Sequence, residues 1–159
     1  MKRLLLATLF LASCGQSGSP DLRIADAWAR ETVAGQASTA AYLTISNRGT
    51  ADDRLVSIVA PEPTKAAVHA TESAGGISRM RELGSGLAVP AGATVELKPG
   101  GTHVMITGLG APLSRGEILK LRLSFEKSGE KPVDVTVAPA TGPKAPHLSG
   151  PPDQLRGPR

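Results

Sequence analysis

Two segments late in the chain alternate strictly between apolar and polar side chains, and this pattern constrains the fold more than any other feature. Residues 118 to 125 read ILKLRLSF, and residues 133 to 137 read VDVTV. Because neighbouring side chains of a β-strand point to opposite faces, a period of two predicts strands that are buried on one face only. The leucines and Phe125 of the first segment and the three valines of the second are the expected core positions.

Shorter strand signals, separated by turn residues, fill the rest of the chain. Three more strands are predicted in this way. The first lies in STAAYLTISNRGT, residues 38 to 50, and is closed by a turn at residues 47 to 49; the second is DRLVSIVAP, residues 53 to 61, ended by Pro61 and Pro63; the third spans residues 94 to 97. Near the start of the domain, Leu22, Ile24 and Trp28 are the expected buried positions. No segment has a long helical period. Turns at short intervals therefore predict one β-sandwich or barrel over residues 22 to 138.

The first 13 residues resemble a lipoprotein signal peptide. Lys2 and Arg3 precede an apolar run at residues 4 to 12, which is shorter than the roughly 20 residues that a membrane-spanning helix needs. The run leads into Leu-Ala-Ser-Cys, a pattern that resembles a bacterial lipobox, so we expect Cys14 to be lipidated. The alternative is an ordinary signal peptide with a chance cysteine. Cys14 is the single cysteine, which excludes an intramolecular disulfide and leaves the domain without a thiol ligand or nucleophile.

Most of the net charge lies outside the predicted domain. The chain carries +4, of which Lys2 and Arg3 contribute two and the tail at residues 139 to 159 a net two more. The domain is thus close to neutral and has no basic stripe with interleaved aromatic residues, which argues against nucleic acid as a partner. Residues 14 to 21 are predicted to be a flexible tether. The Pro- and Gly-rich tail is predicted to be disordered, with His147 as a solvated side chain.

The stretch from residue 69 to 105 concentrates nitrogen and soft sulfur ligands. It holds two of the three histidines and both methionines that follow the initiator: His69, Met80, His103 and Met105. Imidazole and thioether are neutral, and soft thioethers select Cu(I) over harder divalent ions. In a strand, His103 and Met105 share one face while Val104 takes the other, so we expect the pair on an outward face or a strand edge. The pattern indicates a Cu(I) site; the alternative is core-filling methionines and hydrogen-bonded histidines.

The spacing of these four residues, H-x10-M-x22-H-x-M, resembles that of the periplasmic copper chaperone family PCu(A)C. Further matching segments are AWAR at residues 27 to 30, AAYLTISN at 40 to 47, VPAGATVELKPGGTHVM at 89 to 105 and GEILKLRLSFEKSG at 116 to 129. The resemblance implies a cupredoxin-like or immunoglobulin-like antiparallel β-sandwich that is not an enzyme. It also implies one Cu(I) ion, held by His69, Met80, His103 and Met105. Such a protein would carry copper outside the cytoplasm to the dinuclear copper centre of cytochrome c oxidase subunit II, or to another chaperone.

Two other functions stay open. A copper sequestration or resistance protein would use the same four residues without a delivery partner, and a metal-free β-sandwich interaction module would not use them at all. A blue-copper electron carrier is disfavoured, because its cysteine ligand is missing once Cys14 is assigned to the lipobox. A hydrolase is disfavoured too, since no Ser-His-Asp or paired-carboxylate pattern stands out.

The sequence also predicts how the ligands come together. His103 and Met105 are expected to be held by one strand, with His69 and Met80 brought in by a loop at residues 71 to 78. Gly75 and Gly76 would give this loop the freedom to close. Half of the site would then be preorganised and half mobile.

Lipidation at Cys14 is testable by fractionation. Cys14→Ser should release the protein from the membrane fraction, because the acyl chains attached through that thiol would be the anchor. Ser17→Ala, three residues away, is the matched control and should stay with the membrane. Unchanged fractionation of Cys14→Ser would contradict the lipid anchor.

Overall fold

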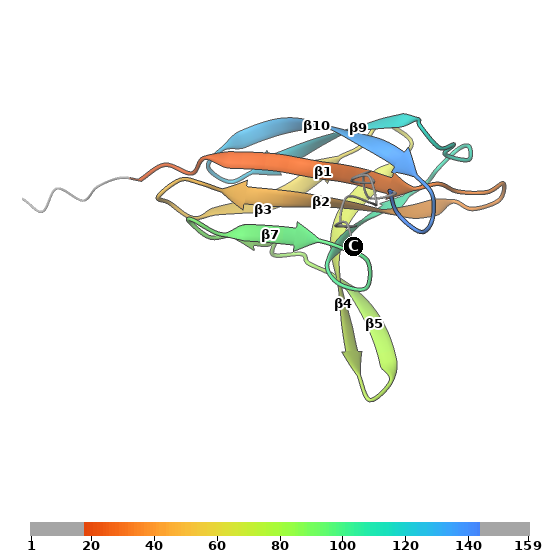
Figure 1. Ribbon diagram of the computed structural model, residues 1–159, viewed down its shortest axis with the longest axis horizontal. Helices are drawn as coiled ribbons and strands as arrows, with labels where there is room; N and C mark the ends of the chain where they lie inside the picture. The colour runs from red at the N-terminus through yellow and green to blue at the C-terminus, as the bar shows by residue number, and fades with distance from the viewer. Residues whose placement is uncertain (1–17, 144–159) are drawn as a thin grey trace, which may run out of the picture.

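A computed structural model describes residues 18 to 143. The predictions for the signal peptide, for Cys14 and for residues 144 to 159 with His147 lie outside this range. The described residues form ten strands and no helix, which confirms the all-β prediction (Figure 1). The strands are β1 (Leu22–Arg30), β2 (Ser38–Asn47), β3 (Asp53–Val59), β4 (Lys65–Ala74), β5 (Ile77–Glu82), β6 (Leu87–Val89), β7 (Thr94–Leu97), β8 (His103–Thr107), β9 (Ile118–Phe125) and β10 (Gly129–Ala138).

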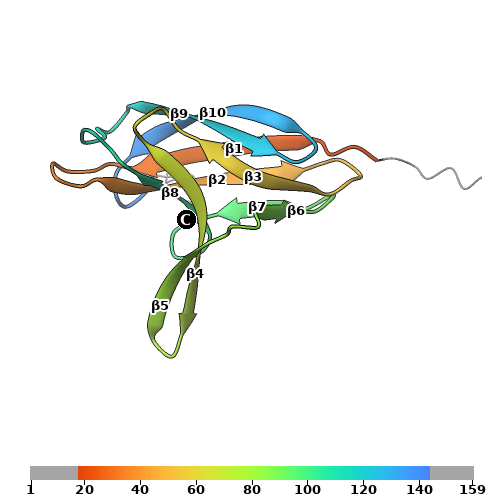
Figure 2. The same cartoon turned by 180° about the vertical axis from the view of Figure 1, so that it is seen from behind.

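Seven of these strands form a closed ring in the order β4-β8-β2-β1-β10-β9-β3. The ring closes where β3 meets β4 at the pair Ile58 and Ala66. β5, β6 and β7 extend it by pairing with β4, β3 and β2. The β4–β5 hairpin projects away from the rest of the molecule (Figures 1 and 2). The fold is thus a barrel-like β-sandwich.

One strand pair departs from the antiparallel prediction. β1 and β10 run parallel, with Trp28 opposite Thr136 and Arg30 opposite Ala138. Antiparallel neighbours are often joined by a short turn that leaves a local sequence signal. β1 and β10 lie at opposite ends of the domain sequence, so their pairing leaves no such signal.

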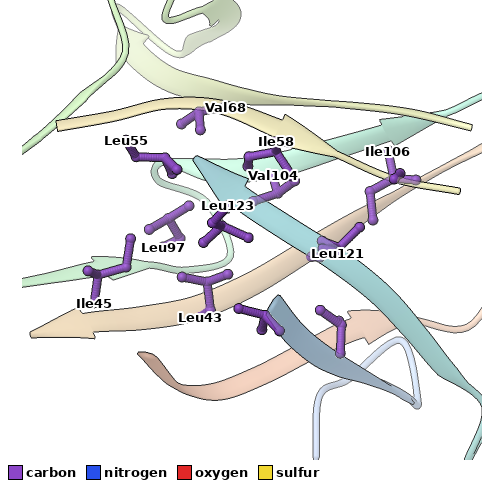
Figure 3. Close-up of a cluster of buried hydrophobic side chains, with 14 of the residues drawn as sticks. Leu43, Ile45, Leu55, Ile58, Val68, Leu97, Val104, Ile106, Leu121 and Leu123 are labelled. Carbon is purple, nitrogen blue, oxygen red and sulfur yellow. The ribbon is translucent and has the colours of Figure 1, made fainter. Parts of the chain in front are cut away.

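The alternating segments supply the core as predicted. In β9 and β10 the side chains of Leu121, Leu123, Phe125, Val133, Val135 and Val137 are buried. All of these except Val137 belong to one cluster with residues from other strands, among them Leu43, Ile45, Leu55, Val104 and Ile106 (Figure 3). These apolar contacts exclude water from the space between the strands, and this burial is the main favourable term for the fold.

A β-bulge in β1 corrects the prediction for Trp28. The register between β1 and β2 shifts between Ala25 and Trp28, and Asp26 has a positive φ of 54°. An extra residue in a strand exchanges the two faces of everything that follows it. Leu22 and Ile24, before the bulge, pack against the core as predicted, but after it Ala29 is the fully buried residue. Trp28 therefore lies on the outer face.

Both ends of the described chain are tied to the domain. Ser19 and Asp21 accept hydrogen bonds through their carbonyls from the backbone of Thr50 and Arg48, at 3.0 and 2.8 Å. The Asn47 side chain accepts a hydrogen bond from the backbone of Asp21 at 3.1 Å and donates to the carbonyls of Ala51 and of Val89, the last residue of β6. Residues 18 to 21, assigned to the tether from the sequence, are thus hydrogen-bonded to the domain. At the other end, residues 139 to 142 make a hydrogen-bonded turn rather than starting the tail directly.

Asp53 is a buried carboxylate that joins β3 to the β9–β10 turn. It accepts hydrogen bonds from the backbone of Arg54, Lys127 and Ser128 at 2.8, 2.9 and 3.0 Å, and from the Ser128 hydroxyl. Burial by itself raises the pKa of this carboxyl. The hydrogen bonds from Ser128 and from the backbone outweigh that effect, so the pKa lies below its usual range. The ionised carboxylate therefore fixes the β9–β10 turn against β3.

We expect Asp53→Ala to lower the free energy of unfolding by about 2 to 3 kcal/mol, because it leaves buried N–H donors without an acceptor. Asp134→Ala is the control. Asp134 makes an exposed ion pair with Lys120, and its loss should cost less than about 0.5 kcal/mol. Urea unfolding at pH 7, followed by Trp28 fluorescence, measures both, and equal effects would contradict the role of Asp53.

The effect of Asp53 should also depend on pH. Because its folded pKa is depressed, its contribution is fully present above the ordinary aspartate pKa of about 3.9. It is lost as the pH falls through the lower folded value. The difference in unfolding free energy between wild type and Asp53→Ala should thus be constant from pH 7 to about pH 5 and shrink below about pH 4. A difference that grows in acid would contradict this sign.

Candidate metal site

A row of four rings crosses the outer face of the sheet. Trp28 of β1 lies opposite Tyr42 of β2, and His69 of β4 lies opposite His103 of β8. The ring centroids are 4.5 Å apart from Trp28 to Tyr42, 6.5 Å from Tyr42 to His103 and 6.2 Å from His103 to His69. Four adjacent strands thus contribute one ring each. Two of the four predicted ligands form one end of this row.

His103 is held in a fixed orientation. Its Nδ1 lies 2.9 Å from the carbonyl oxygen of Gly101. A carbonyl only accepts hydrogen bonds, so Nδ1 carries the hydrogen and Nε2 keeps its lone pair free for a metal ion. Such a contact to the second ring nitrogen is the usual way in which proteins orient a histidine ligand.

The expected outward position of His103 and Met105 needs a correction. Both side chains face away from the apolar core, since Val104 and Ile106 between and beyond them are fully buried. Met105 is half-buried, but only 6% of His103 is exposed. The neighbouring Tyr42 and His69 rings flank it on the outer face. These contacts come from other strands, so the alternation within β8 did not reveal them.

Met105 and His69 line the same open hollow, which has a volume of about 450 Å³. Met105 lies between Ala40 of β2 and Ala67 of β4 in the strand register. These small neighbours leave room around its thioether. Glu82, which lies opposite His69 on β5, lines the hollow as well. The structure thus brings His69, His103 and Met105 into one region.

Met80 is not part of this group in the structure. It lies opposite Thr71, two residues beyond His69 along β4, and its side chain is 60% exposed. Met105 lies opposite Ala67, two residues before His69. Along β4 the two methionine positions are therefore separated by four residues, about 13 Å. They share a face of the sheet but lie on opposite sides of the histidine pair.

The segment that carries Met80 is a hairpin and not a loop. Residues 71 to 78 belong largely to β4 and β5, and Gly75 and Gly76 form the turn with φ of 57° and 80°. Two successive positive φ values are typical of a tight hairpin turn. β5 is exposed at every residue, as its place on the projecting hairpin leads one to expect (Figures 1 and 2). The expected division into a preorganised pair, His103 and Met105, and a mobile pair is also changed. His69 already faces His103, and only Met80 lies apart.

Sequence reasoning did not assign a role to the residues around the histidines. Burial raises the pKa of the Tyr42 hydroxyl, and the nearby Arg30 guanidinium opposes part of that rise. The guanidinium carbon lies 5.6 Å from the centre of the Tyr42 ring. The segments AWAR and AAYL contain these residues together with Trp28. Only the structure shows that Trp28 and Arg30 lie against Tyr42, which in turn lies beside His103.

Between residues 18 and 143, no group of three or more His, Cys, Asp or Glu side chains is placed to hold a metal ion. In the same range there is no helix long and apolar enough to cross a membrane.

Comparison with known proteins assigns the domain to a family. Residues 22 to 137 match the family described as "Putative lipoprotein LpqE-like". The protein "Putative lipoprotein Lxx21020" of Leifsonia xyli subsp. xyli (strain CTCB07) is 33% identical over 121 residues, which are 76% of this chain and 72% of that protein.

Solved structures share the fold. The solution structure of CuI-DR1885 from Deinococcus radiodurans has a TM-score of 0.59 and 27% identity, covering 81% of this chain and 85% of that one. The copper-bound PCuAC domain from PmoF2 has a TM-score of 0.62 and 22% identity, covering 74% and 92%. The sequence resemblance is thereby confirmed: the chain belongs to the LpqE-like family, and its domain is a β-sandwich of the PCuAC type.

Proposed function

We propose that this protein is an extracytoplasmic carrier of Cu(I), with His69, Met80, His103 and Met105 as the ligands. The observation that carries the proposal is the facing pair of imidazoles, 6.2 Å apart between ring centroids, with the Met105 thioether in the same region. Two nitrogen donors and a soft sulfur donor suit Cu(I) better than harder divalent ions. The similarity to the CuI-DR1885 structure supports the same metal and oxidation state.

The ligand arrangement suits transfer rather than permanent storage. Imidazole and thioether are neutral, so a bound Cu(I) keeps its full positive charge. An acceptor with a thiolate adds a negative ligand, and the ion should pass to it downhill. We propose the dinuclear copper centre of cytochrome c oxidase subunit II as the acceptor, or another copper chaperone. Met80 on the projecting hairpin is the ligand best placed to exchange first, since it is exposed and distant from Met105.

A lipid anchor at Cys14 is part of the same proposal. The lipobox pattern motivates it, and the family match and the Leifsonia xyli relative, both named as lipoproteins, support it. Such an anchor would keep the carrier on the extracytoplasmic side of a membrane, where a copper acceptor is itself embedded.

The loss of Cu(I) affinity on substitution should be larger for the proposed ligands that the structure groups together than for Met80. His103→Ala and Met105→Leu should weaken Cu(I) binding by at least about tenfold, since loss of even an outer-shell contact to a metal ligand costs that much. His69→Ala should behave like His103→Ala, and Met80→Leu should have a smaller effect. Competition against a Cu(I) chelator under reducing conditions measures all four. Wild type with no Cu(I) binding would favour the metal-free interaction module.

The tail should not contribute to the site. A chain truncated after Ala138 and a His147→Ala variant should both bind Cu(I) within about twofold of wild type, because the four proposed ligands lie within the domain. If the truncated chain loses binding while Met80→Leu keeps it, His147 replaces Met80 in the ligand assignment.

Delivery can be separated from sequestration by a transfer experiment. The copper-loaded protein is mixed with a soluble copper-free domain of cytochrome c oxidase subunit II, and the metal content of each is measured after separation. Net transfer to the oxidase domain is expected. Retention of the metal by this protein, with tight binding, would favour sequestration.

A further inference from the structure

Arg30 occupies an unusual position for a charged residue. It ends β1 and is half-buried, and its Nε is buried without a hydrogen-bond partner. None of the ion pairs formed by residues 18 to 143 includes Arg30. A side-chain hydrogen bond links Arg30 to Tyr42, but no carboxylate balances the positive charge. A half-buried cation held in this way costs free energy, which suggests that its charge has a role.

The surroundings of Arg30 point toward the candidate metal site. Arg30 follows Trp28 by two residues and so shares its face of the sheet. Its guanidinium carbon lies 5.6 Å from the centre of the Tyr42 ring, which in turn lies 6.5 Å from the centre of the His103 ring. The positive charge is therefore within about 12 Å of that ligand ring, with an aromatic side chain rather than open solvent between them.

We infer that Arg30 is a specificity-determining residue that favours monovalent over divalent copper at the His69–His103 site. The inference rests on the proposed function. A fixed positive charge repels any bound cation, but it repels a divalent ion twice as strongly as a monovalent one. Arg30 thus weakens the binding of Cu(I) somewhat and that of Cu(II) much more, which also eases the release of the carried ion.

The expected size follows from the distance. At about 12 Å and an effective dielectric constant of about 20, one unit of charge changes a binding constant about tenfold. Arg30 should therefore weaken Cu(I) binding by up to about tenfold and Cu(II) binding by up to about a hundredfold. Arg30 should therefore raise the preference for Cu(I) over Cu(II) by the ratio of these two effects, about tenfold. This ratio corresponds to about 59 mV in the reduction potential of a one-electron couple.

Other charges near the site do not replace this effect. Lys65 and Glu82 line the hollow beside His69 and Met105, but they have opposite signs and both are exposed to solvent. Water and salt screen such exposed charges efficiently. Arg30 is the half-buried charge that lies against the ring row, so its field is screened less.

The test is the Cu(II)/Cu(I) reduction potential of the copper-loaded full-length protein, together with Cu(I) affinity from chelator competition at low ionic strength. Arg30→Gln should lower the potential by about 59 mV and tighten Cu(I) binding by up to about tenfold. Arg30→Lys keeps the charge and should restore most of the wild-type potential. Arg23→Gln, which removes an exposed arginine from the same strand, should leave the potential unchanged.

The outcomes separate this inference from the proposed function. If wild type binds no Cu(I), the proposed function fails. If wild type binds Cu(I) but the potentials of Arg30→Gln and Arg23→Gln are equal, only the role of Arg30 is overturned. A raised potential in Arg30→Gln would overturn it too. Fluorescence of Trp28, the single tryptophan, shows whether each variant keeps its fold. If Arg30→Gln unfolds, Arg30→Met, which keeps much of the side-chain packing without the charge, takes its place and must show the same lowered potential.

Discussion

The pairing of β4 with β8 is the interaction on which the site depends. In its register Val68 lies opposite Val104, and both are buried in the core. The next pair along the two strands is His69 and His103, which therefore meets on the outer face. A shift of one residue in either strand would move a valine into water and a histidine into the core. The free energy of burying the valines thus fixes the relative position of the imidazoles without any contribution from a metal ion.

Much of the fold was accessible from the sequence, because its strands are buried on one face and so alternate visibly. β9 and β10 were identified with their inward residues, and β7 with its ends. The way in which strands far apart in the chain pair with one another could not be predicted from the sequence. The bulge at Asp26, which turns Trp28 outward, depends on how β1 meets β2, and the parallel β1–β10 pair joins segments more than a hundred residues apart.

The candidate site shows the same limit. The common face of His103 and Met105 follows from the spacing of two residues within one strand. The burial of His103 does not, because it comes from Tyr42 and His69 on the neighbouring strands. The glycine pair at the turn was recognised, but two positive φ values there produce a hairpin and not the flexible loop that was expected. Three of the four proposed ligands therefore lie close together, and Met80 lies apart from them.

The exposed hairpin has a consequence for how the protein behaves at high concentration. β5 ends the order of strands in the sheet, so one side of its backbone has no neighbouring strand. Such free edges of a sheet invite pairing with another chain, and exposed Ile77 and Met80 would favour it. Arg79, Arg81 and Glu82 place charged side chains along this edge, where a second copy would have to approach them. The β4–β5 hairpin, which carries the proposed ligand Met80, can therefore extend into solvent without serving as a template for aggregation.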